Sequence, residues 1–208
     1  MNYGILDRVK PLSDFSIMTS NAKKQGQFRD WLHECPIVPD AGDAREVLAY
    51  PEAVAMYKSK QAGPMTIVED TALYAFAAPH LNPSCIRWNE HALLHSPKLS
   101  GTPVRVESWL AVNDGEHITT YRGATTGTWI TPETMPDDCN DLDAAVVPED
   151  CTKCIHDLLK GRRFRRDRFT FGSPSHYRLA SIINLLNDIS ESQIKIDDLP
   201  VWHGEWQK

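Results

Sequence analysis

The chain has 208 residues, of which 41% are hydrophobic and 24% charged, and these proportions suit an ordinary globular protein with a core of its own. The formal net charge of -6 argues against nucleic acid or another polyanion as a partner. No apolar run approaches the roughly 20 residues of a membrane helix, and the first residues lack the apolar core of a signal peptide, so we expect no membrane association.

The first third of the chain predicts strands that alternate with helices. We expect residues 1–14 to be an N-terminal arm, and a single domain with two lobes and a cleft to follow over residues 15–208. Its first elements are a strand over 15–18 and a helix over 21–32. A strand that runs directly into a helix is typical of an α/β fold.

A second helix and a second strand follow. Pro51 suits the first turn of a helix that runs to Ala62, and Gly63-Pro64 ends it. Residues 65–68 form a short apolar strand. The acidic pair Glu69-Asp70 comes directly after this strand, so we expect it to lie at the strand's carboxyl end.

The middle of the chain predicts a hairpin. Its first strand alternates, with one face made of Val104, Val106, Ser108, Leu110 and Val112. Asn113-Asp114-Gly115 is a turn signal, and Ile118–Tyr121 returns as the partner strand. Together with the elements before it, the hairpin predicts an α/β fold with a central mixed sheet flanked by helices.

The last third is harder to interpret. Residues 131–172 give no clear pattern. A helix over 174–186 is expected after them, with Ser173 as its cap. The stripe that should face the core consists of Tyr177, Ala180, Ile183 and Leu186. The tail after this helix is unassigned.

The segment Thr19-Ser-Asn-Ala-Lys-Lys24 could bind phosphate, since it ends a strand and opens a helix. Backbone N–H groups at the N-terminus of a helix favour an anion. Thr19 and Asn21 can add neutral donors, and Lys24 can fold back over the same place. The alternative is an ordinary capped helix start with solvated lysines.

Three acidic residues could serve a metal site. Glu69 and Asp70 stand where α/β sheets place ligands, outside the carboxyl end of a strand. Mg²⁺ prefers oxygen ligands, typically one or two carboxylates, which Glu46 and Asp70 could supply. Taken alone, Glu46 could instead form a capping box with Asp43, Lys58 could be solvated, and the acidic pair could lie in a surface turn.

In combination and in order, these motifs resemble the inosine triphosphate pyrophosphatase family. The resemblance begins at Thr19-x-Asn21-x-x-Lys24 and passes through Glu46 and Lys58. It then covers Gly63-Pro64 up to Leu73, and it is strongest before that residue. Weaker similarities extend it to residue 187, at Leu142-Asp143, Val146-Val-Pro148 and Ser175-His176.

The resemblance implies a Mg²⁺-dependent enzyme that hydrolyses a purine (deoxy)nucleoside triphosphate to monophosphate and pyrophosphate, in order to control a nucleotide pool. A water would attack the α-phosphorus, with Asp70, Glu46 and Lys24 as the catalytic residues. Metal ligands would be Glu46 and Asp70, with Glu69 near or supporting them. The phosphates would be held by Thr19, Asn21, Lys24 and Lys58. The resemblance also implies a homodimer.

The chain departs from the family on the side that binds the base, where Asp143, Ser175, His176 and Tyr177 stand. The family's Ser-His-Arg becomes Ser-His-Tyr177, and that arginine helps to recognise the 6-keto group of the purine. Tyr177 offers one hydroxyl instead of a fork of donors. Arg178, one position further on, is expected to point elsewhere. A stacking ring is also missing before Asp143, so we expect a base other than that of inosine or xanthosine.

Three other interpretations stay open. The first is a nucleotide-binding or regulatory module with weak catalysis. The second is a nucleic-acid-binding protein that uses Arg162–Arg168, although the net charge speaks against it. The third is a zinc site formed by Cys139, Cys151, Cys154 and His156, although their spacing matches no established pattern. Otherwise we expect the five cysteines to be reduced thiols in a cytoplasmic protein.

Overall fold

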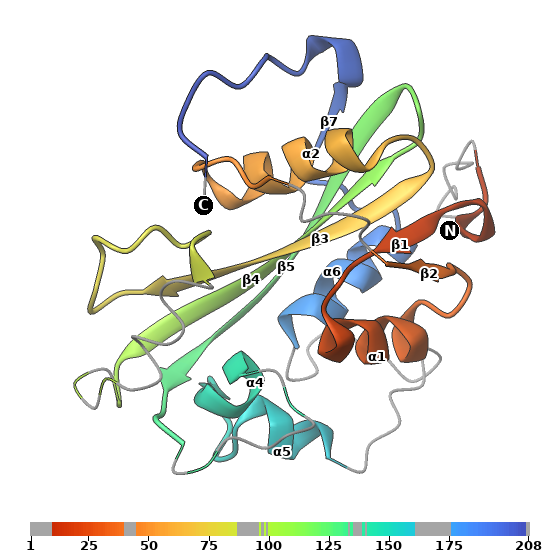
Figure 1. Cartoon of the computed structure of the whole chain (residues 1–208). Coiled ribbons are helices and arrows are strands. Elements are labelled where there is room, and N and C mark those ends of the chain that lie inside the picture. The colour runs from red at the N-terminus through yellow and green to blue at the C-terminus, as the bar shows by residue number, and fades with distance from the viewer. Residues whose placement is uncertain are drawn as a thin grey trace, which may run out of the picture.

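The computed structural model describes residues 10–39, 45–86, 96, 98, 100–132, 134, 139, 141–160 and 176–206. Seven strands in this part of the chain form one mixed sheet in the order β2-β1-β3-β4-β5-β6, and β7 pairs with β5. Helix α2 lies on one side of the strands, and α1, α4, α5 and α6 lie on the other (Figure 1). The predicted α/β fold with a mixed sheet flanked by helices is therefore confirmed.

The first strand and helix agree with the prediction to within one residue at each end. β1 (Ser16–Met18) runs parallel to β2 (Ile37–Val38) and to β3 (Thr66–Ala75). α1 (Ala22–Trp31) connects β1 to β2. Because β1 is short, it pairs only with the first two residues of β3 and leaves the rest of that edge to other parts of the chain.

β3 continues far beyond its predicted end at residue 68. It pairs antiparallel with β4 (Pro103–Asn113), from Thr66 opposite Asn113 to Ala75 opposite Val104. The acidic pair Glu69-Asp70 therefore lies within the strand and not after it. The prediction was wrong because it followed only the apolar residues, whereas buried polar side chains are tolerated in a strand where partners reach them.

The predicted hairpin around Asn113-Asp114-Gly115 is confirmed. Gly115 has φ 97°, a left-handed conformation that favours glycine, and Asp114 Oδ1 accepts from the backbone N–H of His117. β5 (His117–Trp129) is longer than expected. Its first part pairs with β7 (Ser192–Lys195) and its last part with β6 (Val146–Pro148).

Each face of the sheet has its own core. α2 (Pro51–Ala62), whose ends match the prediction, packs on β3, β4 and β5. α6 (Tyr177–Leu186) packs on β4 and β5 from the other side. The larger core cluster lies on the side of α1 and α6 and includes Phe28, Leu110 and Ile182.

Residues 131–172 gave no pattern, and their described part contains two short helices, α4 (Asp141–Ala145) and α5 (Ile155–Leu159). They pack together around a second core cluster that includes Trp129 and Tyr177. Helices of five residues are too short to show a helical periodicity, which is why the sequence did not reveal them.

α6 buries a face different from the predicted stripe of Tyr177, Ala180, Ile183 and Leu186. Its buried residues are Tyr177, Arg178, Leu179, Ser181, Ile182 and Leu185. The buried face differs from the predicted one because two polar residues, Arg178 and Ser181, are buried through hydrogen bonds to side chains of the sheet. The expected cap Ser173 lies outside the described residues, and His176 caps the helix with Nδ1, which accepts from the Arg178 N–H at 3.1 Å.

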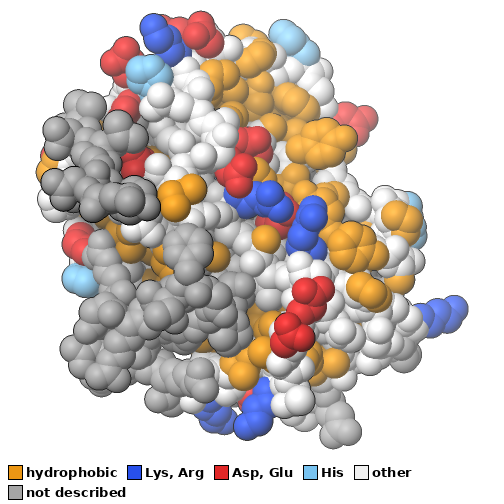
Figure 2. All heavy atoms as spheres, turned by 180° about the vertical axis from the view of Figure 1, so that it is seen from behind, with side chains coloured by type: hydrophobic (Ala, Val, Ile, Leu, Met, Phe, Trp, Pro, Cys, Tyr) orange, Lys and Arg blue, Asp and Glu red, His pale blue; other side chains and the backbone are white. Residues whose placement is uncertain are grey.

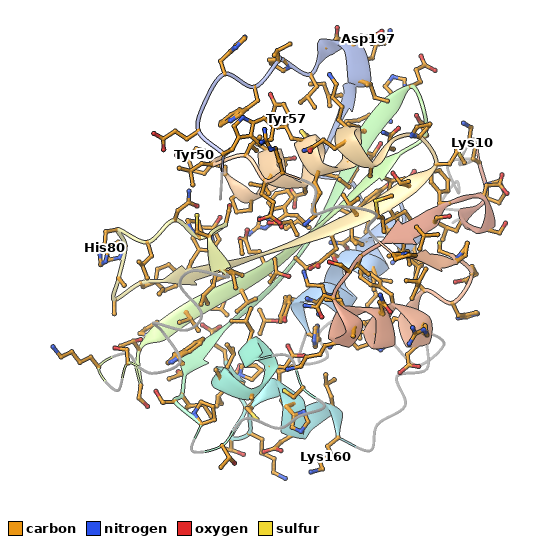
Figure 3. The ribbon with its side chains drawn as sticks, viewed as in Figure 1. Lys10, Tyr50, Tyr57, His80, Lys160 and Asp197 are labelled. Atoms are coloured by element: carbon orange, nitrogen blue, oxygen red, sulfur yellow. The ribbon has the colours of Figure 1, made fainter. Side chains whose placement is uncertain are left out.

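Both ends of the described chain pack onto other elements. Near the N-terminus, Leu12 in the 3-10 turn η1 (Leu12–Asp14) packs on the larger core. After η4 (Ile196–Asp198), the tail crosses α2, where the Tyr57 hydroxyl donates to the Pro200 carbonyl at 2.8 Å (Figure 3). In the described part of the chain, no helix combines the length and apolar character that a membrane span needs.

Candidate active site

Charged residues from distant parts of the sequence form two groups beside the middle of β3, one on each face of the sheet. Lys58 Nζ, on α2, lies 3.0 Å from Glu46 Oε1 and 3.7 Å from Asp70 Oδ1. Lys24 Nζ, on α1, lies 2.6 Å from Oε2 of Glu69, the residue next to Asp70 on β3. The structure therefore gathers the residues that the sequence assigned to phosphate and metal binding.

The N-terminus of α1 lies near Glu69 because β1 runs directly into the helix and Lys24 stands in its first turn. Asn21 Oδ1 accepts from the N–H groups of Lys23 and Lys24, at 3.0 and 3.2 Å, and Thr19 Oγ1 accepts from the Asn21 N–H at 3.3 Å. These bonds confirm the cap. The alternative of a solvated lysine is wrong for Lys24, because its side chain is 19% exposed and is paired with Glu69.

The neighbouring acids Glu69 and Asp70 point to opposite faces of the sheet, as successive strand residues do. Glu69 faces α1 and α6, where it contacts Lys24 and Arg178. Asp70 faces α2, where it lies near Lys58. One ion on the α2 side can therefore reach Asp70, and the expectation that Glu69 takes part in the metal site needs correction.

Both oxygens of Glu69 are occupied by protein donors. Oε2 accepts from Lys24, and Oε1 accepts from the hydroxyls of Thr71 at 2.7 Å and Ser108 at 2.9 Å. Burial alone would raise the pKa of Glu69, but Arg178 and then Lys24 outweigh it and lower this pKa well below its ordinary value. Glu69 is thus a fixed anion inside the protein.

Asp70 is less well satisfied. It is 6% exposed, and its buried Oδ2 atom has no hydrogen-bond partner among the described residues. Burial raises the pKa of Asp70 to about 7; Lys58 opposes this shift, and Glu46 adds to it. A buried carboxylate oxygen without a partner is costly, so this site is suited to a cation that supplies one.

Glu46 is the second acid that contacts Lys58. It lies before the isolated bridge of Val47 with Trp206 and not at a helix start, because α2 begins at Pro51. The capping-box alternative for Glu46 is therefore wrong, while Asp43 lies outside the described residues. Lys58 is not a solvated lysine, because its side chain is 18% exposed and lies between two acids.

The residues expected on the base side form a closed group of hydrogen bonds. Asp143 Oδ1 accepts from the Tyr177 hydroxyl at 2.8 Å, and Asp143 Oδ2 lies 3.2 Å from His176 Nε2. Gln27 Nε2, from α1, donates to Asp143 Oδ2 at 3.0 Å. The expectation that Tyr177 faces a base needs correction, because this residue is 0% exposed. Ser175 lies outside the described residues.

The carboxylate of Asp143 should stabilise the fold through this group. Burial would raise its pKa, but His176 and, after it, Arg178 and Tyr177 lower it to about 2. A depressed pKa adds stability that is fully present above about pH 4 and is lost as the pH falls through about 2.

We expect Asp143→Asn to lower the free energy of unfolding at pH 7 by on the order of 2 kcal/mol. The difference from the wild type should shrink below pH 3, where Asp143 takes up its proton. Urea unfolding between pH 2 and 7 measures it, with the exposed Asp197→Asn as the matched control. A loss that stays the same across this range would contradict the electrostatic explanation.

Arg178 does not point away from the site as expected. It is 1% exposed, Nη2 donates to Thr71 Oγ1 at 3.2 Å, and Nη1 donates to Gln27 Oε1. Its Nε lies 3.3 Å from Glu69 Oε1 as an ion pair. The expectation was wrong because a long side chain in the first turn of a helix can reach back past the helix end.

Sequence reasoning missed three polar residues that support this arrangement, Gln27, Ser108 and Ser181. Ser108 bonds to Glu69 and lies 3.0 Å from Ser181 on α6. A signal was present for Ser108, because it is the polar member of the otherwise apolar stripe of its strand. Gln27 gave none, since a glutamine in a helix is usually solvated.

A second charged group lies on the sheet face that carries Asp70. Glu107 accepts from Arg122 at 2.8 Å and from the Trp109 indole at 3.0 Å, and Arg105 Nε lies 3.0 Å from it. From behind, basic and acidic side chains lie next to each other near the middle of the molecule (Figure 2). The two arginines are thus compensated within the protein.

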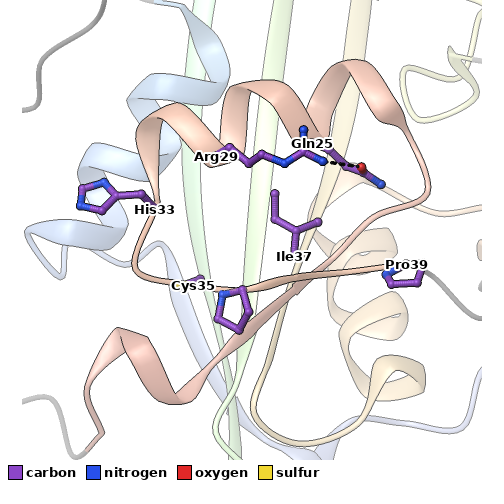
Figure 4. Close-up of a pocket in the computed structure, with 7 residues that line it drawn as sticks. Gln25, Arg29, His33, Cys35, Ile37 and Pro39 are labelled. Carbon is purple, nitrogen blue, oxygen red and sulfur yellow. Dashed lines mark hydrogen bonds between the residues drawn. The ribbon is translucent and has the colours of Figure 1, made fainter.

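A pocket of about 420 Å³ lies away from these acids, between α1 and β2 (Figure 4). It is lined by Gln25, Arg29, His33, Cys35, Pro36, Ile37 and Pro39. Arg29 Nη2 donates to Gln25 Oε1 at 3.1 Å along its wall. None of the residues that the sequence singled out for chemistry lines it.

None of the five cysteines, all of which lie within the described residues, forms a disulfide. Cys139 is buried, and Cys151 and Cys154 are half-buried in the segment before α5, with Cys154 as its N-cap residue. Among the described residues, no group of three or more histidine, cysteine or acidic side chains is placed to hold a metal alone. The zinc interpretation thus gains no support, and a cation at Glu46 and Asp70 would need further oxygen ligands.

The fold is similar to that of the Staphylococcus aureus Ham1 protein, with 16% sequence identity and a TM-score of 0.52 over 84% of this chain and 97% of that one. A nucleoside-triphosphatase from Mycobacterium abscessus, named a dITP/XTP pyrophosphatase, aligns with 16% identity and a TM-score of 0.42 over 84% and 98%. No family model and no curated protein matches the sequence.

Proposed function

We propose that this protein is a nucleoside triphosphate pyrophosphatase that uses Mg²⁺ to hydrolyse a (deoxy)nucleoside triphosphate to monophosphate and pyrophosphate. The observation that carries the proposal is that Lys58 lies between Glu46 and Asp70, with one Asp70 oxygen left without a partner among the described residues, while Lys24 pairs with Glu69, the residue next to Asp70. The fold shared with the Ham1 protein and the resemblance of these motifs to inosine triphosphate pyrophosphatases support it.

The phosphates would bind between α1 and α2. Lys24 and Lys58 supply positive charge from the two helices, and the Thr19–Asn21 turn adds neutral donors at the N-terminus of α1. Phosphoryl transfer depends mainly on positioning and on charge neutralisation, which such a group provides. Each ammonium has three donors, so Lys24 can bind a phosphate oxygen while it keeps its bond to Glu69.

Glu46 and Asp70 would hold Mg²⁺, since both are carboxylates on the α2 side of β3 and both face Lys58. When bound, the ion would neutralise phosphate charge and acidify a water. In this proposal the Asp70 carboxylate would also accept the proton of the water that attacks the α-phosphorus.

The preferred base would differ from that of inosine or xanthosine. In the resembling family an arginine recognises the 6-keto group, whereas Arg178 and Tyr177 of this chain are both sealed inside the protein. Their donors are used by Thr71, Gln27 and Asp143, so neither can offer a fork to a purine. A purine nucleotide with an altered or otherwise specific base is the substrate class we propose.

A substrate panel tests this function. Pyrophosphate release should be measured with Mg²⁺ over ribo- and deoxyribonucleoside triphosphates with ordinary, deaminated and modified bases, and again after chelation of the metal. We expect one base class to be preferred and release to stop without Mg²⁺. A strong preference for inosine and xanthosine triphosphates would contradict the changed base choice. Binding without release would favour a regulatory nucleotide-binding module instead.

The resemblance also leads us to propose a homodimer. Sedimentation equilibrium of the purified chain, whose monomer mass is 23.5 kDa, tests this, and a monomer at micromolar concentration would contradict it. The cytoplasmic location expected from the free thiols stays a prediction.

A further inference from the structure

Arg178 is the largest charged side chain that the fold encloses fully. It extends from the first turn of α6 to α1 and β3, where it contacts Gln27, Glu69 and Thr71. An enclosed guanidinium must be paired on most sides to be tolerated, and here its partners come from two different elements. Its position therefore fixes α6 relative to both α1 and β3.

A continuous series of contacts leads from Arg178 to the phosphate site. Glu69 binds Arg178 through Oε1 and Lys24 through Oε2, and the Lys24 contact is the shorter, at 2.6 Å against 3.3 Å. Water cannot replace these cations at Glu69, since its side chain is 1% exposed. Removing the charge of Arg178 would leave Lys24 as the one ion-pair partner of this carboxylate among the described residues.

The same series passes along α1. Gln27 lies three residues after Lys24, on the neighbouring turn of the same helix, and its amide oxygen accepts from Arg178 while its amide nitrogen donates to Asp143. The Arg178 guanidinium thus contacts both α1, through Gln27, and the carboxylate of Glu69. Lys24 lies on that same helix and pairs with that same carboxylate.

We infer that Arg178 is a positioning residue, which holds Glu69 and α1 so that Lys24 is kept in place to bind the phosphates of the substrate. The inference rests on the proposed function, and it gives Arg178 a task that involves the phosphates and not the base. A residue that reads the base would have to expose its donors, whereas Arg178 is 1% exposed, its Nη1 and Nη2 atoms donate to Gln27 and Thr71, and its Nε atom lies against Glu69.

Binding of inorganic tripolyphosphate in the presence of Mg²⁺ tests this inference, because the probe has phosphates and no base. Calorimetry should compare the wild type with Arg178→Met, Lys24→Met and the double variant, with Arg29→Met on the exposed side of α1 as the matched control. We expect Arg178→Met to weaken binding about tenfold, and to weaken it no further when Lys24 is already replaced. Arg29→Met should bind like the wild type.

Each other outcome has a distinct meaning. Unchanged tripolyphosphate affinity in Arg178→Met, or an equal loss with and without Lys24, overturns the inference and leaves the proposed function standing. A wild type that neither binds tripolyphosphate nor releases pyrophosphate overturns both.

A second variant covers the case in which Arg178→Met does not fold. Arg178→Lys keeps the charge but loses the bonds to Gln27 and Thr71. We expect it to fold, to lose part of the affinity, and to lose none in the Lys24→Met background. Loss of affinity in that background would overturn the inference as well.

Discussion

Replacing Asp70 with asparagine is expected to stop pyrophosphate release and, in the metal-free protein, to raise stability. The variant keeps the shape of the side chain but removes the charge that would bind Mg²⁺ and accept a proton. Loss of a general base alone lowers a rate by about 10²–10⁴-fold, and loss of a metal ligand adds to this. Activity should therefore fall by at least about 10³-fold.

The gain in stability follows from the raised pKa of Asp70. The native carboxyl has a pKa of about 7, while in an unfolded chain it titrates near 3.9. Because the native state binds this proton more tightly, the free energy of unfolding falls as the pH rises from about 4 to about 7, and it stays low above that. Asparagine has no such loss, so the variant should gain stability above pH 7, by up to about 4 kcal/mol for a difference of about three pKa units, and little below pH 4.

Thermal unfolding in chelator between pH 4 and 8 measures the gain, and each kcal/mol corresponds to a rise in Tm of about 2–4 °C for a chain of this size. Asp30→Asn, the same change at an exposed position of α1, is the matched control and should alter neither activity nor Tm. A less stable Asp70 variant at pH 8 would show that the buried charge is well compensated in the free protein. Retained activity would remove Asp70 from the mechanism.

Replacing Gly123 with alanine is expected to destabilise the fold by about 3 kcal/mol or more. Gly123 on β5 lies opposite Ser108 on β4, where α6 crosses the sheet. A Cβ atom there would meet the backbone of α6 at the Tyr177 carbonyl, at Ala180 and at the Ser181 nitrogen. Backbone atoms cannot turn aside as a flexible side chain can, so the helix would have to move.

Such a movement would also carry Arg178 away from Glu69, and activity should fall together with stability. Urea unfolding and pyrophosphate release of Gly123→Ala measure the two effects. Gly26→Ala offers the matched control, because a Cβ atom at this helical position meets nothing within 4 Å. It should stabilise the protein by about 0.5–1 kcal/mol, as alanine does in place of glycine inside a helix. A tolerated Gly123→Ala would contradict the close packing of α6.

Local signals in the sequence were sufficient for several elements and motifs. α2 begins at Pro51 and ends before Gly63, and the hairpin turns at Asn113-Asp114-Gly115. These positions could be predicted because proline, glycine and asparagine restrict or favour particular backbone conformations. The same holds for the capped start of α1. The length of β3 could not be predicted, because Glu69 and Asp70 are tolerated within a strand only through partners that come from other elements.

The sequence by itself determined the α/β class, the ends of α2, the hairpin turn and the identity of the acids and lysines that meet at β3. These properties follow from residue types and short motifs that can be read from the sequence. Only the tertiary structure decided that Glu69 and Asp70 face opposite sides of the sheet and that Arg178 turns inward to Glu69. The physical reason is that a buried charge goes where its partners are, and those of Arg178 on β3 lie more than a hundred residues away along the chain.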